Sequence, residues 1–169
     1  MAKLATNRRA AAFAAVLALG LVLSACARGP DGEPGGLGIG VGFGATVAGS
    51  IEEFVSAVGD RVFFDTDSAD LSAQARQTLD GQARWLNQYP RFHITVEGHA
   101  DERGTREYNI ALGARRATAV RDYLAALGVG ANRIRTISYG KERPVALCND
   151  ISCWSQNRRS VSVIENAGA

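Results

Sequence analysis

With 169 residues, the chain has room for one ordinary domain and its tails, whereas two full domains would not fit comfortably. The formal net charge is +2, but three basic residues, Lys3, Arg8 and Arg9, lie within the first nine positions. Removing these three from the 19 basic residues leaves 16 against 17 acidic ones, so the rest of the chain lacks the basic surface that nucleic-acid binding needs.

Residues 1–25 have the layout of a secretory signal peptide, with a basic start, an apolar run from Ala10 to Leu23 and small residues before Cys26. The run is shorter than the roughly 18 to 20 apolar residues of a membrane-spanning helix, so cleavage is favoured over the alternative of a retained anchor. The segment Leu23-Ser24-Ala25-Cys26 resembles a bacterial lipobox. That resemblance implies palmitate-type lipid on Cys26, which would begin the mature chain, and more than one acyl chain anchors a protein stably.

Residues 26–49 are expected to hold the lipidated cysteine and a glycine-rich linker. Glycine at this density loses too much backbone entropy on ordering, so a flexible tether is the first expectation. Between positions 37 and 43, Leu, Ile, Val and Phe alternate with the glycines, which leaves open a weak self-association or membrane-contact segment. Ala27 is not the aspartate that commonly retains lipoproteins in the inner membrane, so we expect an outer-membrane anchor with the domain facing the periplasm.

A folded domain is expected at residues 50–165, followed by a short tail at 166–169. Its predicted elements are, in chain order, a strand at 61–64, a helix from about 73 to 89, a strand at 92–98, a helix from about 105 to 127, and strands at 134–139 and 160–164. Ser72 is the expected N-cap of the first helix, and Gly128 closes the second. A loop with Pro144 and two cysteines precedes the last strand.

The strand at 92–98 decides the predicted fold class. Its apolar residues alternate with His93, Thr95 and Glu97, so only one of its faces is buried. Both helices therefore belong on one face of an open mixed sheet. The prediction is a two-layer α/β sandwich of the α+β class with the element order β-α-β-α-β-β.

The three cysteines are expected to have two different roles, one for a single cysteine and one for a pair. If Cys26 carries lipid, Cys148 and Cys153 remain as a pair that can form a disulfide in an oxidising periplasm, with two free thiols as an alternative. A metal site would need two further ligands, and the two histidines, His93 and His99, lie on a different segment. We therefore predict a disulfide and no metal.

Polar residues gather just beyond the first two strands, at Asp65 and in the loop 98–104. In open sheets backed by helices, ligands collect at the carboxyl ends of the strands. One stripe of the second helix adds Asn109, Leu112 and Arg116. Arg116 offers a planar fork to a carboxylate and Asp101 a counter-charge to an ammonium, which together suit a zwitterionic amino-acid head group. Because Arg116 lies roughly 16 Å along the helix from its start, at ~1.5 Å per residue, the loop must fold back for the two to share a ligand.

Structural roles remain open as alternatives at these positions. Asp65 could cap a turn, His99 could orient the loop, and Arg116 could pair with Glu97 or Asp101. A hydrolase built on His99, Asp101 and Glu102 would need a nucleophile or a metal set in the same cleft, and the sequence places neither there. The chain is therefore not expected to be an enzyme or to hold a cofactor.

Five motifs within this domain resemble a known family. They are Val62-Phe63-Phe64-Asp65, Glu97-Gly98-His99-Ala100-Asp101-Glu102-Arg103-Gly104-Thr105-Arg106-Glu107-Tyr108-Asn109, Leu112-Gly113-Ala114-Arg115-Arg116-Ala117, Ser138-Tyr139-Gly140 and Gln156-Asn157-Arg158-Arg159. Together they are similar to the OmpA-like peptidoglycan-binding domain. The resemblance implies non-covalent binding of the peptide stem of peptidoglycan through its diaminopimelate residue, with Asp101 and Arg116 on either side of it.

The same resemblance assigns further residues to the ligand groove. It implies that the 99–104 loop folds back against the helix and that His99 is structural. The residues that it places in or under the groove are Phe64, Asp65, Asn109 and Leu112.

The acidic loop from Asp101 to Thr105, together with the lipobox, is most similar to outer-membrane lipoproteins of the Tol system. That resemblance implies a tether between outer membrane and cell wall, with TolB-like and TolA-like partners and a part in envelope integrity and cell division. The alternative is a general OmpA-like structural envelope lipoprotein without Tol partners. The cysteine loop and the glycine-rich segment are not general features of the family.

Overall fold

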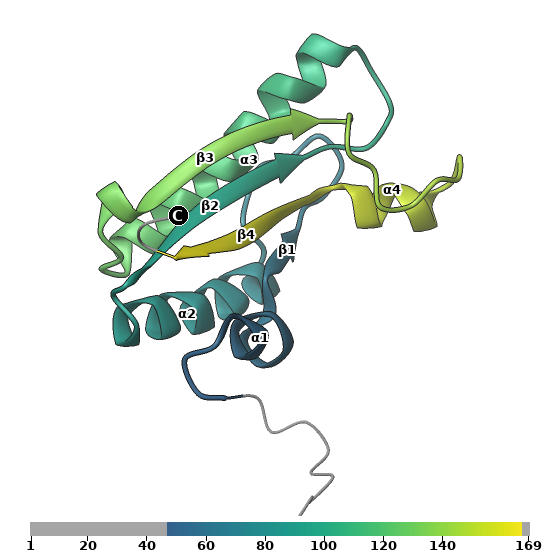
Figure 1. Cartoon of the computed structure of the whole chain (residues 1–169). Coiled ribbons are helices and arrows are strands. Elements are labelled where there is room, and N and C mark those ends of the chain that lie inside the picture. The colour runs from purple at the N-terminus through teal and green to yellow at the C-terminus, as the bar shows by residue number, and fades with distance from the viewer. Residues whose placement is uncertain (1–46, 167–169) are drawn as a thin grey trace, which may run out of the picture. The chain divides into compact units, whose positions relative to one another are not determined.

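The computed structural model describes residues 47–166 (Figure 1). The expected signal peptide, Cys26 and most of the linker lie outside the described residues. The helices are α1 (Ile51–Glu53), continued by a π-helix (Phe54–Gly59), then α2 (Ala73–Gln88), α3 (Arg106–Ala126), a single 3₁₀ turn (Ala131–Arg133) and α4 (Ile151–Asn157). The strands are β1 (Arg61–Phe63), β2 (Phe92–His99), β3 (Ile134–Gly140) and β4 (Arg159–Asn166).

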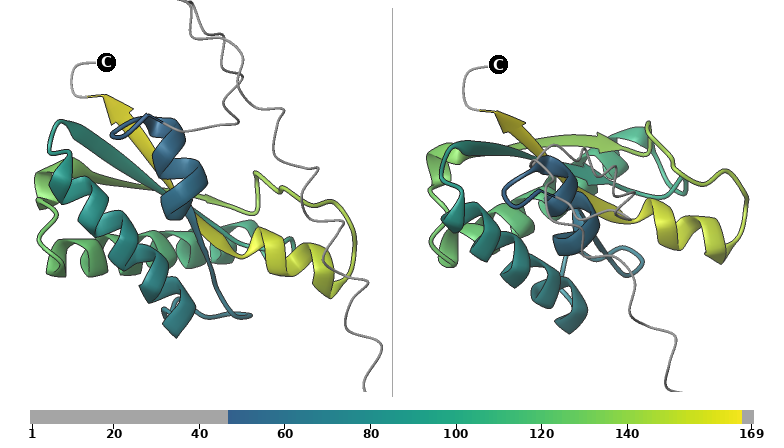
Figure 2. Two further views of the ribbon diagram at one scale, coloured as in Figure 1. Left: turned by 90° about the horizontal axis from the view of Figure 1, so that it is seen from below. Right: turned by 60° about the horizontal axis from the view of Figure 1, so that its bottom comes forward.

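The four strands form one mixed sheet in the order β1-β4-β2-β3. The last strand in the sequence, β4, lies between β1 and β2 and runs antiparallel to both, whereas β2 and β3 are parallel. Figure 2 shows α2 and α3 side by side on one face of this sheet. The predicted α+β fold with both long helices on one face of a mixed sheet is confirmed.

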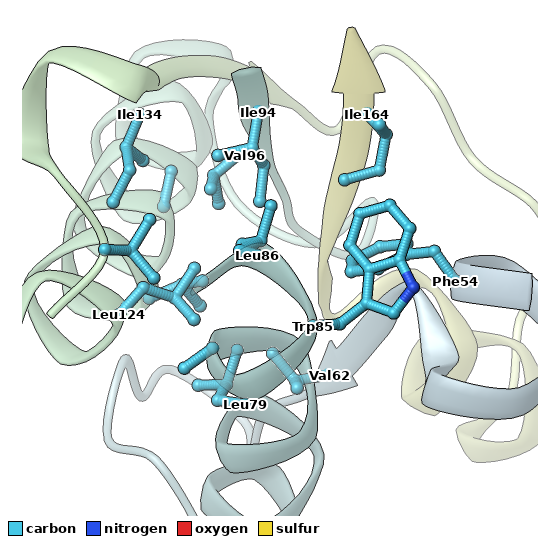
Figure 3. Packing of buried hydrophobic residues seen from close by; sticks show 14 of the residues in the cluster. Phe54, Val62, Leu79, Trp85, Leu86, Ile94, Val96, Leu124, Ile134 and Ile164 are labelled. Atoms are coloured by element: carbon cyan, nitrogen blue, oxygen red, sulfur yellow. The ribbon is translucent and has the colours of Figure 1, made fainter. Parts of the chain in front are cut away.

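The core lies between the sheet and this helical layer. On β2, Phe92, Ile94 and Val96 are buried and alternate with partly exposed polar residues, as the sequence predicts. Figure 3 shows the buried side chains of β2 meeting Leu86 of α2 and Leu124 of α3. The inward face of the sheet is thereby covered, and the two helices are held at fixed positions relative to its edge.

Besides the 3₁₀ turn, two short helical segments were not predicted. The first, formed by α1 and the π-helix, begins at Ser50, whose hydroxyl accepts a hydrogen bond from the Glu53 amide, and it buries Phe54 against Trp85 with ring centroids 5.0 Å apart. The second is α4, which occupies part of the region expected to be a loop before β4. The loop prediction is wrong for residues 151–157, because Asp150 caps a helix there through the Ser152 amide.

Candidate functional site

A hollow of about 290 Å³ opens beyond the carboxyl end of β2. Three segments enclose it: the loop after β1, the loop between β2 and α3, and the first half of α3. Its lining residues are Thr66, Asp67, Asp101, Arg103, Gly104, Tyr108, Asn109, Leu112 and Arg116. The expected edge of the sheet therefore does carry a concave polar site.

Helix α3 approaches β2 closely beside this site. A Cβ atom on Gly98 would lie 2.6 Å from the carbonyl carbon of Gly113, so only glycine allows this contact. The loop between them folds back along the helix, as the resemblance implied. Asn109 stabilises that conformation, because its buried amide group donates to the carbonyls of Arg103 at 2.7 Å and Thr105 at 3.0 Å.

Arg116 forms the floor of the hollow and has no exposed surface. Its guanidinium donates to three main-chain carbonyls, those of Ser68 at 2.8 Å, His99 at 2.8 Å and Asp65 at 3.0 Å. It thus joins the loop after β1 to the loop after β2. The suggested pairing with Glu97 or Asp101 is wrong, since within residues 47–166 no carboxylate oxygen lies within 4.0 Å of this guanidinium.

The charge on Arg116 is poorly compensated. Burial, reinforced by the nearby Arg158 cation, lowers the pKa of Arg116 to about 10, although Asp101 and Asp67 act in the opposite direction. Three of its five N–H groups donate to the carbonyls of the two loops. The remaining donors and the positive charge favour an anion at the bottom of the hollow.

Asp101 stands in the wall of the hollow, between two arginines. Arg103 contacts both carboxylate oxygens through its side chain, at 3.1 and 2.6 Å, and Arg158 approaches one of them at 3.4 Å. Burial raises the pKa of Asp101, but the hydrogen bonds from Arg103 and Arg158 outweigh this effect and hold the pKa below its usual value. Asp101 is therefore a carboxylate at neutral pH.

The other residues expected in the groove are divided between two places. Leu112 and Asn109 line the hollow. Phe64 is buried against Arg116, with the guanidinium 5.1 Å from its ring centroid, but it lines a second depression next to the hollow's floor residue and not the hollow itself. Asp65 holds Arg116 through its carbonyl, but it lines the same second depression, of about 410 Å³, instead of the hollow.

Five residues of the lining were not assigned to the site from the sequence: Thr66, Asp67, Arg103, Gly104 and Tyr108. Tyr108 hydrogen-bonds to Asp67 across the hollow, which ties α3 to the loop after β1. Asp67 adopts a left-handed conformation with φ of 57°, and no periodic pattern reveals such a position. Arg103 lies in one of the motifs that resemble the family, but its contacts could not be predicted from the sequence.

His99 does not line the hollow. Its ring is buried beside Tyr139, with centroids 5.6 Å apart, and burial together with the Arg159 and Arg143 charges lowers its pKa to about 4. The side chain is thus neutral and structural, as expected.

Cys148 and Cys153 form a disulfide in this structure, with Cα atoms 5.6 Å apart. Within residues 47–166, no cluster of three or more His, Cys, Asp or Glu side chains could ligate a metal. None of the helices in that same part of the chain combines the length and apolar character needed to cross a bilayer.

Comparison with known proteins gives consistent matches. Residues 63–158 match the OmpA family. The chain is 60% identical over 153 residues to the peptidoglycan-associated lipoprotein of Rhizobium meliloti, covering 90% of this chain and 87% of that protein. It is 59% identical over 168 residues to the protein of the same name from Agrobacterium fabrum, covering 99% and 93% respectively.

Solved structures agree with the fold. The crystal structure of the peptidoglycan-associated lipoprotein from Burkholderia pseudomallei matches with a TM-score of 0.64 and 42% identity, over 68% of this chain and 98% of that one. The C-terminal domain of Helicobacter pylori MotB matches with a TM-score of 0.60 over 64% of this chain and 86% of that one. At 24% identity, the second match concerns the fold alone.

Proposed function

This chain belongs to the OmpA family, and from that membership we propose that it is an envelope lipoprotein whose domain binds peptidoglycan without covalent chemistry. Its relatives at 52 to 60% identity are named peptidoglycan-associated lipoproteins, and they cover most of this chain. Their name describes association with peptidoglycan, and binding without turnover is the function proposed for this chain.

The observation that carries the proposal is a buried cation without an anion. Arg116 lies at the floor of the hollow with its charge poorly compensated, while Asp101 stands in the wall as a carboxylate. A ligand that brings a carboxylate to the floor and an ammonium to the wall would satisfy both groups. The site therefore selects for the zwitterionic end of an amino acid.

Diaminopimelate in the peptide stem of peptidoglycan supplies such an end on an aliphatic side chain. In the proposed complex its ammonium displaces Arg103 from Asp101, and its carboxylate approaches Arg116. Leu112 and the Tyr108 ring offer apolar surface for the methylene groups. Phe64 and Asn109 act indirectly, because one supports the arginine from below and the other fixes the loop.

Sedimentation with purified diaminopimelate-type peptidoglycan tests this site. Asp101→Asn keeps the size of the side chain but removes its charge, so the affinity should fall by at least about tenfold, which corresponds to roughly 1.4 kcal/mol. Asp122→Asn is the matched control, because Asp122 is an exposed carboxylate of α3 that also pairs with an arginine, Arg121. If Asp101→Asn and wild type sediment equally, the hollow is not the binding site.

We further propose that lipid on Cys26 anchors the chain in the outer membrane, so that the domain links this membrane to the cell wall. A TolB-like and a TolA-like protein are the proposed partners, in a role that maintains the envelope during cell division. The alternative is a structural envelope lipoprotein without such partners. Co-purification of a TolB-like protein with the full chain distinguishes them, because the alternative predicts none above the level of a tag-only control.

A further inference from the structure

Beside the hollow, the segment between β3 and β4 is built around the disulfide-closed helix α4. The Cys148–Cys153 bond closes the first turn of this helix onto the preceding loop. At the other end, the Asn157 side chain accepts from the Val145 amide at 2.8 Å and donates to the Ala146 carbonyl at 2.9 Å. The helix is therefore fixed to its own loop from both ends.

This helix presents Trp154 to the loop that carries Asp101. The Arg103 guanidinium lies over the indole, 4.2 Å from the ring centroid, and the indole N–H donates to the Glu102 carboxylate. Trp154 does not line the hollow itself. Its side chain reaches the ligand site through Glu102 and Arg103, the two residues that follow Asp101.

Arg103 is held from three directions. It contacts Asp101 through both oxygens, it lies over Trp154, and it reaches the Thr66 hydroxyl at 3.5 Å. In the proposed complex, the ligand ammonium binds the Asp101 carboxylate, so Arg103 loses only its contact with Asp101. Stacking on the indole then keeps the guanidinium at the rim of the hollow, with N–H groups free for a ligand carboxylate.

We propose that Trp154 is a positioning residue that makes the site selective for a zwitterionic end over a lone ammonium, an inference that rests on the proposed peptidoglycan function. Arg103 and Arg116 line the hollow with two carboxylates, Asp67 and Asp101, and Arg158 also approaches Asp101. An incoming ammonium without a carboxylate therefore adds a fourth cation beside two carboxylates. A diaminopimelate end brings the missing anion, whereas a lysine end does not. Freeing Arg103 from the indole weakens its attraction for the ligand carboxylate and so reduces the preference for diaminopimelate.

The test compares two tripeptide stems that differ only in the third residue, meso-diaminopimelate or lysine, binding to the full-length protein in detergent micelles. Wild type should prefer the diaminopimelate peptide by at least about tenfold. Trp154→Leu should lose about three- to tenfold in affinity for that peptide and stay within about twofold for the lysine peptide. Trp154→Phe keeps an aromatic face under Arg103 and should stay within about twofold of wild type for both peptides.

Tyr89, at the end of α2, provides a matched control. Its ring also contacts an arginine, Arg91, whose guanidinium carbon lies 5.7 Å from the ring centroid. Tyr89→Leu should leave the preference unchanged. Circular dichroism on each variant separates loss of selectivity from loss of fold. The inference is overturned, with the proposed function intact, if Trp154→Leu keeps the preference or if Trp154→Phe loses as much as Trp154→Leu. If wild type binds neither peptide, the proposed function fails and the inference with it.

Fluorescence gives an independent readout. The chain has two tryptophans, so Trp85→Phe leaves Trp154 as the sole emitter. The emission of Trp154 should change on addition of the diaminopimelate peptide, because Arg103 loses one partner and gains another above the indole. The lysine peptide should produce no change at the same concentration. Equal changes with both peptides would contradict a role of Trp154 in selectivity.

Discussion

At the scale of single residues, Arg116 has a structural role besides the binding role proposed for it. Its three bonds to the carbonyls of Asp65, Ser68 and His99 join the loop after β1 to the end of β2. Arg116→Gln leaves buried carbonyls without donors, so we expect the free energy of unfolding to fall by about 3 kcal/mol or more. Urea unfolding measures this difference.

The matched control for Arg116→Gln is Arg121→Gln on the same helix. Arg121 is partly exposed and pairs only with its neighbour Asp122, at 2.8 Å, so its loss should change the free energy of unfolding by less than about 0.5 kcal/mol. A loss below about 1 kcal/mol for Arg116→Gln would show that the three carbonyl contacts contribute little.

His99 makes stability depend on pH in a defined window. The pKa of its buried ring is about 4 in the folded protein and near 6.5 in the unfolded chain. Below pH 6.5 the unfolded chain binds a proton that the folded protein refuses, so stability is full above pH 6.5 and falls as the pH drops towards 4. The loss amounts to about 3 kcal/mol, at 1.36 kcal/mol for each pH unit. Glu97 lies 3.4 Å from Nε2 and opposes this shift, but burial dominates.

His99→Phe tests this dependence, because phenylalanine cannot take up a proton. Between pH 7 and 4, wild type should lose about 3 kcal/mol more than His99→Phe in urea unfolding, while both lose stability alike from their carboxylates. His93, the other histidine, is only half-buried, and His93→Gln should follow the wild-type curve. Parallel curves for wild type and His99→Phe would show that His99 is not neutral in the folded state.

Site residues were predictable where their placement depends on helical spacing. Asn109, Leu112 and Arg116 are separated by three and four positions, and the structure brings all three to one hollow. The partners of Asp101 could not be derived in this way. Arg158 reaches it from beyond α4, 57 residues away, and that approach depends on β4 inserting between β1 and β2.

At the scale of elements, the contact between β2 and α3 sets the depth of the site. Gly98→Ala would place a methyl group against the Gly113 carbonyl, with its carbon only 2.6 Å away, and so push the helix from the sheet. We expect a loss of about 3 kcal/mol in the free energy of unfolding, at the upper end of what overpacking produces. Gly81→Ala in α2 is the control, because its methyl group has 3.5 Å to Val58 Cγ1 and should stabilise by about 0.5 to 1 kcal/mol. Equal effects at both positions would exclude the close approach as the cause.

The disulfide should stabilise α4 through the unfolded chain. A bond between residues five apart closes a small loop, for which the chain-entropy relation gives about 2 kcal/mol. Replacing both Cys148 and Cys153 by serine should lower the free energy of unfolding by that amount. Thiol titration of the unfolded Cys26→Ala protein checks the premise, since two reactive thiols would mean that the bond does not form.

The long elements were predictable and the short helical segments were not, for a physical reason. Helices α2 and α3 span 16 and 21 residues, so their apolar stripes repeat over several turns, and β2 alternates along its whole length. Helix α4 has only seven residues, so its apolar pattern repeats too few times to predict a helix, and a disulfide bond supports it. The segment that buries Phe54 includes a π-helix, whose spacing differs from the 3.6-residue period.

At the scale of the whole molecule, the proposed tether has two ends that can be removed separately. Cys26→Ser would remove the lipid acceptor and leave the hollow intact, so the protein should pass from the membrane fraction to the soluble periplasm yet still sediment with purified peptidoglycan. Asp101→Asn should remain in the membrane fraction but sediment less with purified peptidoglycan. If Cys26→Ser stays with the membrane, the apolar run before it is a retained anchor and the lipobox interpretation is wrong.

A link that bears tension fails when either end is released, whereas a protein with two independent functions loses them one at a time. Cells carrying Cys26→Ser or Asp101→Asn should therefore release outer-membrane vesicles at the same rate as cells lacking the protein, and the double variant should add nothing further. Vesicle counts at equal protein abundance measure this, with Asp122→Asn as the control that keeps the wild-type rate. Additive effects of the two changes would mean that lipid and hollow act separately, and the chain would then be an anchored binding protein without a mechanical role.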